Sequence, residues 1–185
     1  GGAISGDMDR RQALADASLG RFMAEATVRL LFIRHGDAGD PGEWIGPDME
    51  RPLTDRGVKQ VSRLAAGLLA ARTKIDAVRT APARRCGETA AIIAAALDIV
   101  PSADALLAEG LELNDLTKLV PKRAGCVALV GHEPHLVAVA RELTGIAHLT
   151  LPKGSMLRVD APRPFAPGSG ELIWLAPPSL FRAPK

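Results

Sequence analysis

The chain has 185 residues, of which 47% are hydrophobic and 24% charged, and its formal net charge is +2. This length can bury one sizeable core, and the composition is that of an ordinary globular protein rather than a disordered or fibrous one. Because Lys and Arg are scattered and the net charge is small, a nucleic-acid partner is not expected. No stretch approaches the roughly 18 uninterrupted apolar residues of a membrane-spanning helix, and no apolar centre of a secretory signal precedes residue 27. We therefore expect a cytoplasmic protein with no membrane partner.

The sequence divides the chain into an N-terminal extension and one predicted domain. Residues 1–26 are interpreted as an N-terminal extension, whether a tag remnant, a tail or a docked helix, because the apolar positions of 9–24 fit a helical period only loosely. Residues 27–185 are predicted to form a single domain. Two cysteines, Cys86 and Cys126, do not make the dense pattern of a disulfide-stapled fold, so we expect free thiols.

Strand and helix patterns alternate along this domain. The predicted strands are 28–33, 75–80, 98–100 and 126–130, and the predicted helices are 55–71, 85–97, 112–120 and 134–143. Residues 37–51 are rich in Gly and Pro and are predicted to form a loop. Two last strands, 155–160 and 171–175, flank a Pro- and Gly-rich turn. This order predicts a three-layer α/β/α fold with a mostly parallel central sheet, helices on both faces and a C-terminal antiparallel hairpin.

The first candidate site motif is Arg34-His35-Gly36, which directly follows the first predicted strand. A neutral imidazole can attack phosphorus and form a covalent phosphohistidine, and an arginine beside it can bind two phosphoryl oxygens. The glycine would let a phosphate approach the backbone. Taken alone, the tripeptide is equally compatible with a histidine that only hydrogen-bonds a neighbouring loop.

A second motif places Arg84 and Arg85 at the start of a predicted helix, where free backbone amides and the helix dipole favour an anion. Adjacent arginines cannot both face inward, and Arg85 is the predicted phosphate ligand. A third motif contains His132 at a strand end, where it can donate a hydrogen bond to a transferring phosphoryl group. His132 and His135 are three residues apart, but no third ligand stands at a suitable spacing, so no metal site is predicted.

These motifs, in this order, resemble the histidine phosphatase superfamily, which has a phosphoglycerate mutase-like fold, and in particular its SixA-type phosphohistidine phosphatases. The resemblance spans Val28 to about Leu175 and is carried by Arg34 to Ala38, Arg51 to Thr54 with Gly57, Ala81 to Thr89, and Val130 to Pro134. It implies that His35 is the nucleophile, that Arg34 and Arg85 bind the phosphate, that His132 completes the pocket, and that no metal is needed. We predict no other cofactor, and we expect His35, His132 and Glu133 to contact the phosphate as well. Position 81 departs from the pattern, because many relatives have a serine where this chain has Ala81.

The general acid is less well defined by the sequence. The resemblance implies a carboxylic acid between the second and third motifs for relatives that act on phosphate esters, and Glu109 is the candidate. A solvated loop carboxylate is an equally good interpretation of Glu109, and Asp37 and Glu133 are alternatives. An alkoxide leaving group needs a proton, whereas the imidazole of a phosphohistidine leaves more readily. A weak acid position therefore favours a phosphoramidate substrate.

Together, these features predict a metal-independent phosphatase that forms a phosphohistidine intermediate on His35 and dephosphorylates phosphohistidine on a protein. The short segment between Arg85 and His132 leaves little chain for a lid, and an open site suits a phosphate displayed on a protein surface. One alternative is a phosphatase of small phosphate esters or pyrophosphates. Another is a phosphate-binding regulatory domain with little or no turnover. The sequence does not indicate the oligomeric state.

Overall fold

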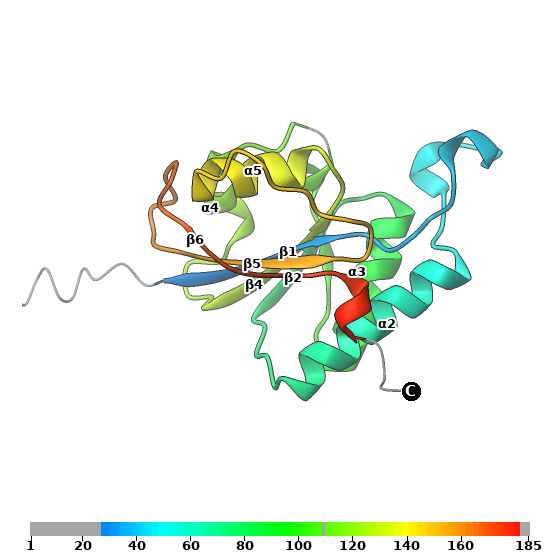
Figure 1. Ribbon diagram of the computed structural model, residues 1–185, viewed down its shortest axis with the longest axis horizontal. Helices are drawn as coiled ribbons and strands as arrows, with labels where there is room; N and C mark the ends of the chain where they lie inside the picture. The colour runs from blue at the N-terminus through cyan, green and yellow to red at the C-terminus, as the bar shows by residue number, and fades with distance from the viewer. Residues whose placement is uncertain (1–26, 109, 182–185) are drawn as a thin grey trace, which may run out of the picture.

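A computed structural model describes residues 27–108 and 110–181 (Figure 1). The interpreted N-terminal extension and the candidate acid Glu109 lie outside these described residues. The sheet order is β3-β2-β4-β1-β5-β6. Its strands are β1 (Val28–Arg34), β2 (Ala77–Thr80), β3 (Ser102–Ala103), β4 (Cys126–Gly131), β5 (Met156–Ala161) and β6 (Glu171–Ala176). Neighbours from β3 to β1 pair in parallel, and β5 and β6 add an antiparallel edge.

Helices cover both faces of this sheet. They are α2 (Asp55–Ala70), α3 (Arg84–Leu97), α4 (Leu116–Leu119) and α5 (His135–Thr144). In Figure 1, α4 and α5 lie above the sheet and α2 lies below it, with α3 packed against α2. This division follows from right-handed crossovers. The connections through α2 and α3 move the chain from β1 toward the β3 edge of the sheet, whereas the connection through α4 moves it back to β4, so α4 lies on the opposite face. The predicted three-layer α/β/α fold is confirmed.

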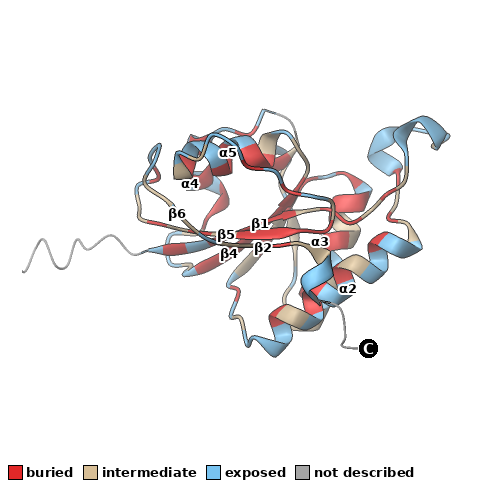
Figure 2. Cartoon of the chain, viewed as in Figure 1, coloured by how far each residue is buried: buried red, intermediate tan, exposed pale blue. Residues whose placement is uncertain are grey.

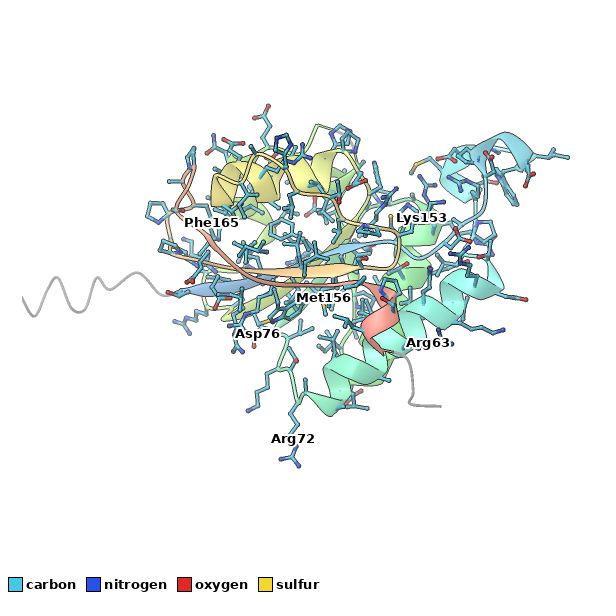
Figure 3. The ribbon with its side chains drawn as sticks, viewed as in Figure 1. Arg63, Arg72, Asp76, Lys153, Met156 and Phe165 are labelled. Carbon is cyan, nitrogen blue, oxygen red and sulfur yellow. The ribbon has the colours of Figure 1, made fainter. Side chains whose placement is uncertain are left out.

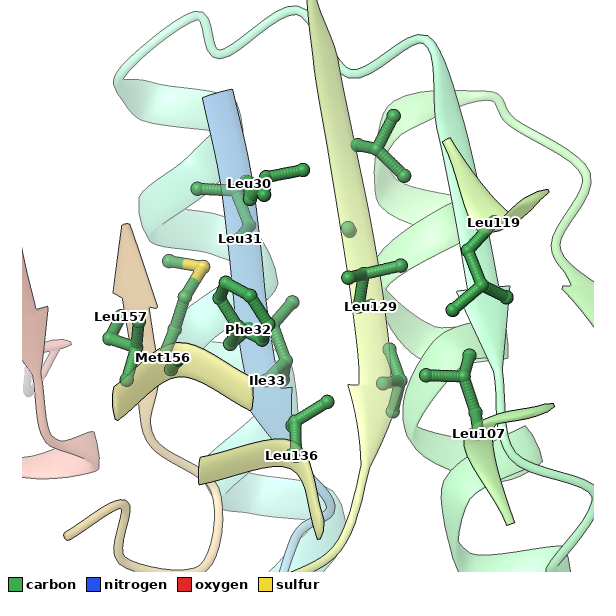
Figure 4. Close-up of a cluster of buried hydrophobic side chains, with 14 of the residues drawn as sticks. Leu30, Leu31, Phe32, Ile33, Leu107, Leu119, Leu129, Leu136, Met156 and Leu157 are labelled. Atoms are coloured by element: carbon green, nitrogen blue, oxygen red, sulfur yellow. The ribbon is translucent and has the colours of Figure 1, made fainter. Parts of the chain in front are cut away.

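The central strands are buried on both faces, which explains their uninterrupted apolar sequences. All six residues of β4 are buried, and in β1 only Arg29 is exposed. In Figure 2, buried residues, coloured red, follow the strands of the sheet. In Figure 3, side chains fill the space between the sheet and the helices. Figure 4 shows Phe32, Leu129 and Leu136 among the buried side chains of this core. Burial of these large side chains fixes the position of the strand ends that carry the candidate site.

Two predicted elements differ from the observed ones. The strand predicted at 98–100 is wrong, because α3 ends at Asp98 in a left-handed conformation (φ 55°) and Val100 is 89% exposed. The edge strand that pairs with β2 is instead the two-residue β3, which begins at Ser102, four residues after the start of the predicted strand. The helix predicted at 112–120 is a 3₁₀ turn (Leu113–Asp115) followed by the short α4. The other predicted strands and helices agree with the structure to within a few residues.

Glycines bring the loop after β1 into close contact with α2. A Cβ atom on Gly57 would lie 2.0 Å from the carbonyl oxygen of Asp37. A Cβ atom on Gly36 would lie 2.8 Å from the Gly57 oxygen and 2.8 Å from the Val61 side chain. Close packing against α2 therefore excludes a side chain at Gly36, a reason that the sequence did not reveal; the predicted approach of a phosphate to this backbone stays a prediction.

The cysteines and helices bear on two further expectations. Both Cys86 and Cys126 are buried free thiols, as predicted, and burial raises the pKa of Cys86 to about 12. Among the described residues, no helix has the length and apolar character needed to cross a membrane.

Candidate active site

Strand register brings the two motif histidines to one edge of the sheet. Arg34 at the end of β1 pairs with Gly131 at the end of β4, and the His35 amide donates to the Gly131 carbonyl oxygen at 3.0 Å. The next strand, β2, ends beside them at Thr80 and leads into α3, which carries Arg85. The site therefore lies at the carboxyl ends of three adjacent parallel strands, where α/β sheets bind their ligands.

His35 is held in the form that a nucleophile requires. Its side chain is buried, and its Nδ1 lies 2.7 Å from the Gly36 carbonyl oxygen. Because a carbonyl oxygen can only accept, Nδ1 carries the proton and Nε2 keeps its lone pair. Burial is the main cause that lowers the pKa of His35 to about 4; the Gly36 hydrogen bond opposes it in part, and the positive charges of Arg85 and Arg34 add to the lowering. The imidazole is therefore neutral at neutral pH.

The two adjacent arginines of α3 point in opposite directions. Arg85 is buried, with a side chain 9% exposed, and contacts Asp48 through both Nη atoms: Nη1 donates to its carbonyl oxygen at 2.7 Å and Nη2 lies 2.9 Å from its carboxylate. Arg84 has a side chain 57% exposed and pairs with Glu88 along the helix. Of the two arginines, only Arg85 is placed to act at the site.

Arg34 reaches the site from β1 and is oriented by Glu133. Its Nη1 donates to Glu133 Oε2 at 2.8 Å and to the Leu151 carbonyl oxygen at 3.0 Å. Glu133 Oε1 accepts from the Leu151 amide at 2.9 Å. Glu133, predicted to bind phosphate, here has its carboxylate on Arg34 and the loop before β5. This arrangement fixes the guanidinium position.

His132 and a small hollow complete the arrangement. The His132 ring contacts His135 edge to face, with 5.9 Å between ring centroids, and its charge also acts to lower the pKa of His35. His135 Nδ1 accepts from the Gly110 amide at 3.3 Å, which fits the structural role expected for it. A hollow of about 300 Å³, here called the alanine pocket, is lined by Asp48, Met49, Ala81, Ala83, Arg85, Ala108 and His132.

Asp48 is a site residue that the sequence did not reveal. Its Oδ1 accepts from Arg51 Nε at 2.8 Å, and Arg51 is itself buried and donates through Nη1 to the carbonyl oxygens of Ala38 and Gly39. Arg51 thus closes the loop that carries Asp48 and places it against Arg85. The contact joins residues 37 positions apart and depends on a loop conformation without any periodic sequence signal.

Thr89 connects two of the motifs. Its buried hydroxyl accepts from the Gly36 amide at 3.2 Å and donates to the Arg85 carbonyl oxygen at 2.7 Å. The sequence singled out Thr89 only as part of the second motif. Its hydrogen bonds tie the loop after β1, which carries His35, to the helix that carries Arg85.

Among the candidates for the general acid, Asp37 is a poor proton donor. Burial acts to raise its pKa, but hydrogen bonds from Thr54 and Lys153 outweigh burial and lower it below the ordinary value. Lys153, labelled in Figure 3, lies in the loop before β5. Glu109 is outside the described residues, although its neighbour Ala108 lines the alanine pocket. No cluster of three or more His, Cys, Asp or Glu side chains suited to a metal ion occurs within residues 27–108 and 110–181.

Comparison with known proteins identifies the family. An uncharacterized protein of Picosynechococcus sp. is 33% identical over 162 residues, which cover 82% of this chain and 97% of that protein. Residues 30–119 match the model of the histidine phosphatase superfamily (branch 1). The chain belongs to this superfamily. As a histidine phosphatase, it carries the arginine, histidine and glycine of the first motif within the matched range and His132 beyond it.

Solved structures share the fold of this histidine phosphatase at low sequence identity. The protein histidine phosphatase SixA in complex with tungstate has a TM-score of 0.74 at 20% identity, covering 84% of this chain and all of that one. A mycobacterial glucosyl-3-phosphoglycerate phosphatase has a TM-score of 0.60 at 18% identity, covering 80% of this chain and 98% of that one. The fold is therefore shared by phosphatases with different substrates.

Proposed function

We propose that this histidine phosphatase removes the phosphoryl group from phosphohistidine on a protein, without a metal, through transfer to His35. The observation that carries the proposal is the state of His35: it is buried and neutral, its Nδ1 proton is held by Gly36, and Nε2 is left as the nucleophilic atom. Two arginines and a second histidine surround it, which suits attack on a dianionic group.

The first chemical step forms a bond between Nε2 and phosphorus while the bond to the leaving group breaks. The His35 ring becomes cationic when it is phosphorylated, and its Nδ1 keeps its proton and donates it to the Gly36 carbonyl oxygen, which stabilises that charge. Arg34, Arg85 and His132 offer donors to the phosphoryl oxygens. Among the described residues, the Nε atoms of both arginines are buried without a hydrogen-bond partner, so each retains donor capacity that the protein does not use. Water then attacks phosphorus, and His35 leaves.

Phosphohistidine is favoured as substrate because its imidazole can leave without a proton from the enzyme. The described carboxylates near the site are engaged by cations, and the pKa values of Asp37 and Asp48 are both lowered, so they are ionised and cannot donate. A fold relative that is described as a protein histidine phosphatase supports the same substrate class. The partner of this enzyme would then be a phosphorylated protein, met in the cytoplasm.

A phosphatase of small esters is the competing function, and one observation favours it. Ala108 lines the alanine pocket, so its neighbour Glu109 is close in sequence to a position from which an acid could protonate an alkoxide. The fold relative that acts on glucosyl-3-phosphoglycerate belongs to this class. The two functions differ in whether Glu109 is needed.

The test compares hydrolysis of a histidine-phosphorylated protein and of p-nitrophenyl phosphate, both with a metal chelator present. We expect the wild type to prefer the phosphoprotein, His35→Ala to lose both activities, and Glu109→Gln to keep the phosphoprotein activity. A phosphoenzyme that is acid-labile and absent from His35→Ala would support the covalent step. Faster ester hydrolysis that Glu109→Gln abolishes would establish the competing function, and no turnover of either substrate would favour a phosphate-binding domain.

A further inference from the structure

The alanine pocket has no role in the steps described so far. It shares Arg85 and His132 with the proposed phosphoryl site, but neither His35 nor Arg34 belongs to its wall. A phosphoryl group held by Arg85 and His132 therefore borders the pocket, while His35 lies outside the pocket wall. Because displacement at phosphorus places the attacking and leaving atoms roughly in line, the leaving group is the part of the substrate that would enter this hollow.

The walls of the pocket suit a small, flat ring. Ala81 and Ala83 are each 1% exposed and present only methyl groups, and Ala108 adds a third. Met49, half exposed, supplies a flexible and polarisable side chain at the rim. At about 300 Å³, the hollow is at the lower limit of ligand pockets, so it accommodates one ring rather than an extended sugar.

Among the described residues, Asp48 is the carboxylate in this wall, and two arginines hold it in position. Arg51 Nε holds Oδ1 at 2.8 Å and Arg85 Nη2 holds Oδ2 at 2.9 Å. The hydrogen bond from Arg51 is the main cause that lowers the pKa of Asp48 below its ordinary value. An ionised carboxylate accepts hydrogen bonds and donates none, and each of its oxygens has a further lone pair. The pocket therefore offers an acceptor to its occupant.

We propose that the alanine pocket binds the leaving imidazole of the substrate phosphohistidine and that Asp48 accepts a hydrogen bond from its N–H. The inference rests on the proposed function and names the residue that recognises the leaving group. In the reactive form, one ring nitrogen of the substrate bears phosphorus and the other bears the proton facing Asp48. The lone pair of His35 Nε2 forms the new bond, the electron pair of the old P–N bond goes to the leaving nitrogen, and neutral imidazole departs with its N–H intact.

This arrangement makes the transfer nearly symmetric between two imidazoles. On the enzyme, the N–H of His35 is held by the Gly36 oxygen at 2.7 Å, and on the substrate the N–H is held by the Asp48 carboxylate. Each acceptor stabilises the ring that carries positive charge on its side of the transition state. An alkoxide leaving group gains nothing from Asp48, because two anions would face one another. The pocket thus discriminates between phosphoramidates and esters.

The experiment uses phosphoimidazole and p-nitrophenyl phosphate as substrates, and inorganic phosphate as a competitive inhibitor. Asp48→Asn removes the charge at constant size. Asp48 and Glu50 belong to one 3₁₀ turn (Asp48–Glu50). Glu50→Gln is the matched control, because Glu50 is exposed and does not line the pocket. We expect Asp48→Asn to lower kcat/KM for phosphoimidazole about 10- to 100-fold, as for loss of a hydrogen bond to a charged group. Ester turnover and phosphate inhibition should weaken by a clearly smaller factor, because they depend on Arg85 but not on the contact with the leaving imidazole.

A second comparison needs no variant. N-methyl-N′-phosphoimidazolium lacks the N–H, so the wild type should turn it over at least about tenfold less efficiently than phosphoimidazole. Equal loss of both activities in Asp48→Asn, with weaker phosphate inhibition, would show that Asp48 only holds Arg85 and would overturn the inference. If Asp48→Asn keeps the full preference for phosphoimidazole, the inference about Asp48 is also overturned, but the proposed function is not. A wild type that prefers the ester would instead overturn the proposed function itself.

Discussion

The two ends of the parallel strands carry hollows that differ in size and in the use of charge. The larger, about 590 Å³, lies before β2 and includes Arg72, Asp76 and Asp98 in its lining, and Arg72 and Asp76 are labelled in Figure 3. There, Asp76 accepts from the backbone amides of Gly125 and Cys126 at 2.7 and 2.9 Å. At the opposite end, by contrast, Asp48 binds a buried arginine beside a hollow half as large. Buried, paired charge therefore indicates the site better than volume does.

Removal of the buried Arg85 should have the largest effect, and it tests whether the functional site lies at the end of the strands with the smaller hollow. Arg85→Ala should lower kcat/KM about 100- to 1000-fold, because it removes a preorganised donor to the phosphoryl group and the partner of Asp48. Arg84→Ala is the matched control, since its exposed ion pair with Glu88 contributes little. Steady-state kinetics of both variants test the assignment, and equal effects would refute it.

A second prediction concerns the pH dependence of stability. The pKa of His35 is about 4 in the folded protein and close to 6.5 when unfolded, so the unfolded chain binds more protons between these values and stability falls as the pH falls through this window. The loss should reach about 3 kcal/mol from pH 7 to pH 4. Urea unfolding of the wild type and His35→Ala should show this slope only in the wild type. Parallel profiles would mean that burial does not hold His35 neutral.

The connection between the two motifs can be tested through Thr89. Thr89→Val keeps the shape but leaves the buried Gly36 amide without its acceptor, which should destabilise the fold by about 1–3 kcal/mol and reduce kcat through the adjacent His35. Thr89→Ser keeps the hydroxyl and should retain most of the activity. Thermal unfolding and steady-state kinetics of both variants check this prediction. If Thr89→Val and Thr89→Ser behave alike, the Thr89 hydroxyl does not connect the two motifs.

At the opposite end of the strands, we expect an effect on stability alone. Asp76→Ala removes the acceptor of two backbone amides and should destabilise the protein by about 1–2 kcal/mol while kcat/KM stays unchanged. Lys74→Ala, an exposed change in the same hollow, should alter neither. A loss of turnover in Asp76→Ala would show that the larger hollow takes part in function.

The sequence was informative where local pattern and burial agree. The apolar runs of β1 and β4 predicted the strands because burial on both faces demands such runs, and those strands end at the two motif histidines. The false strand at 98–100 shows the limit: Ile99 and Val100 have strand-like side chains, but chain reversal at Asp98 leaves Val100 in solvent. Asp48 escaped prediction for a related reason, because its contact with Arg85 depends on how Arg51 closes a loop. Register and loop closure are tertiary properties that no short window encodes.

The close approach of Gly57 to Asp37 also decides how this enzyme can be engineered for heat resistance. Replacing a helical glycine by alanine commonly gains about 0.5–1 kcal/mol. In α3, Gly87→Ala should give this gain, because nothing lies within 4 Å of the added methyl group. In α2, the same change at Gly57 would place that group 2.0 Å from the Asp37 carbonyl oxygen and push away the loop that carries His35. Melting temperatures of the two variants should therefore move in opposite directions, and a thermostabilised enzyme has to keep Gly57.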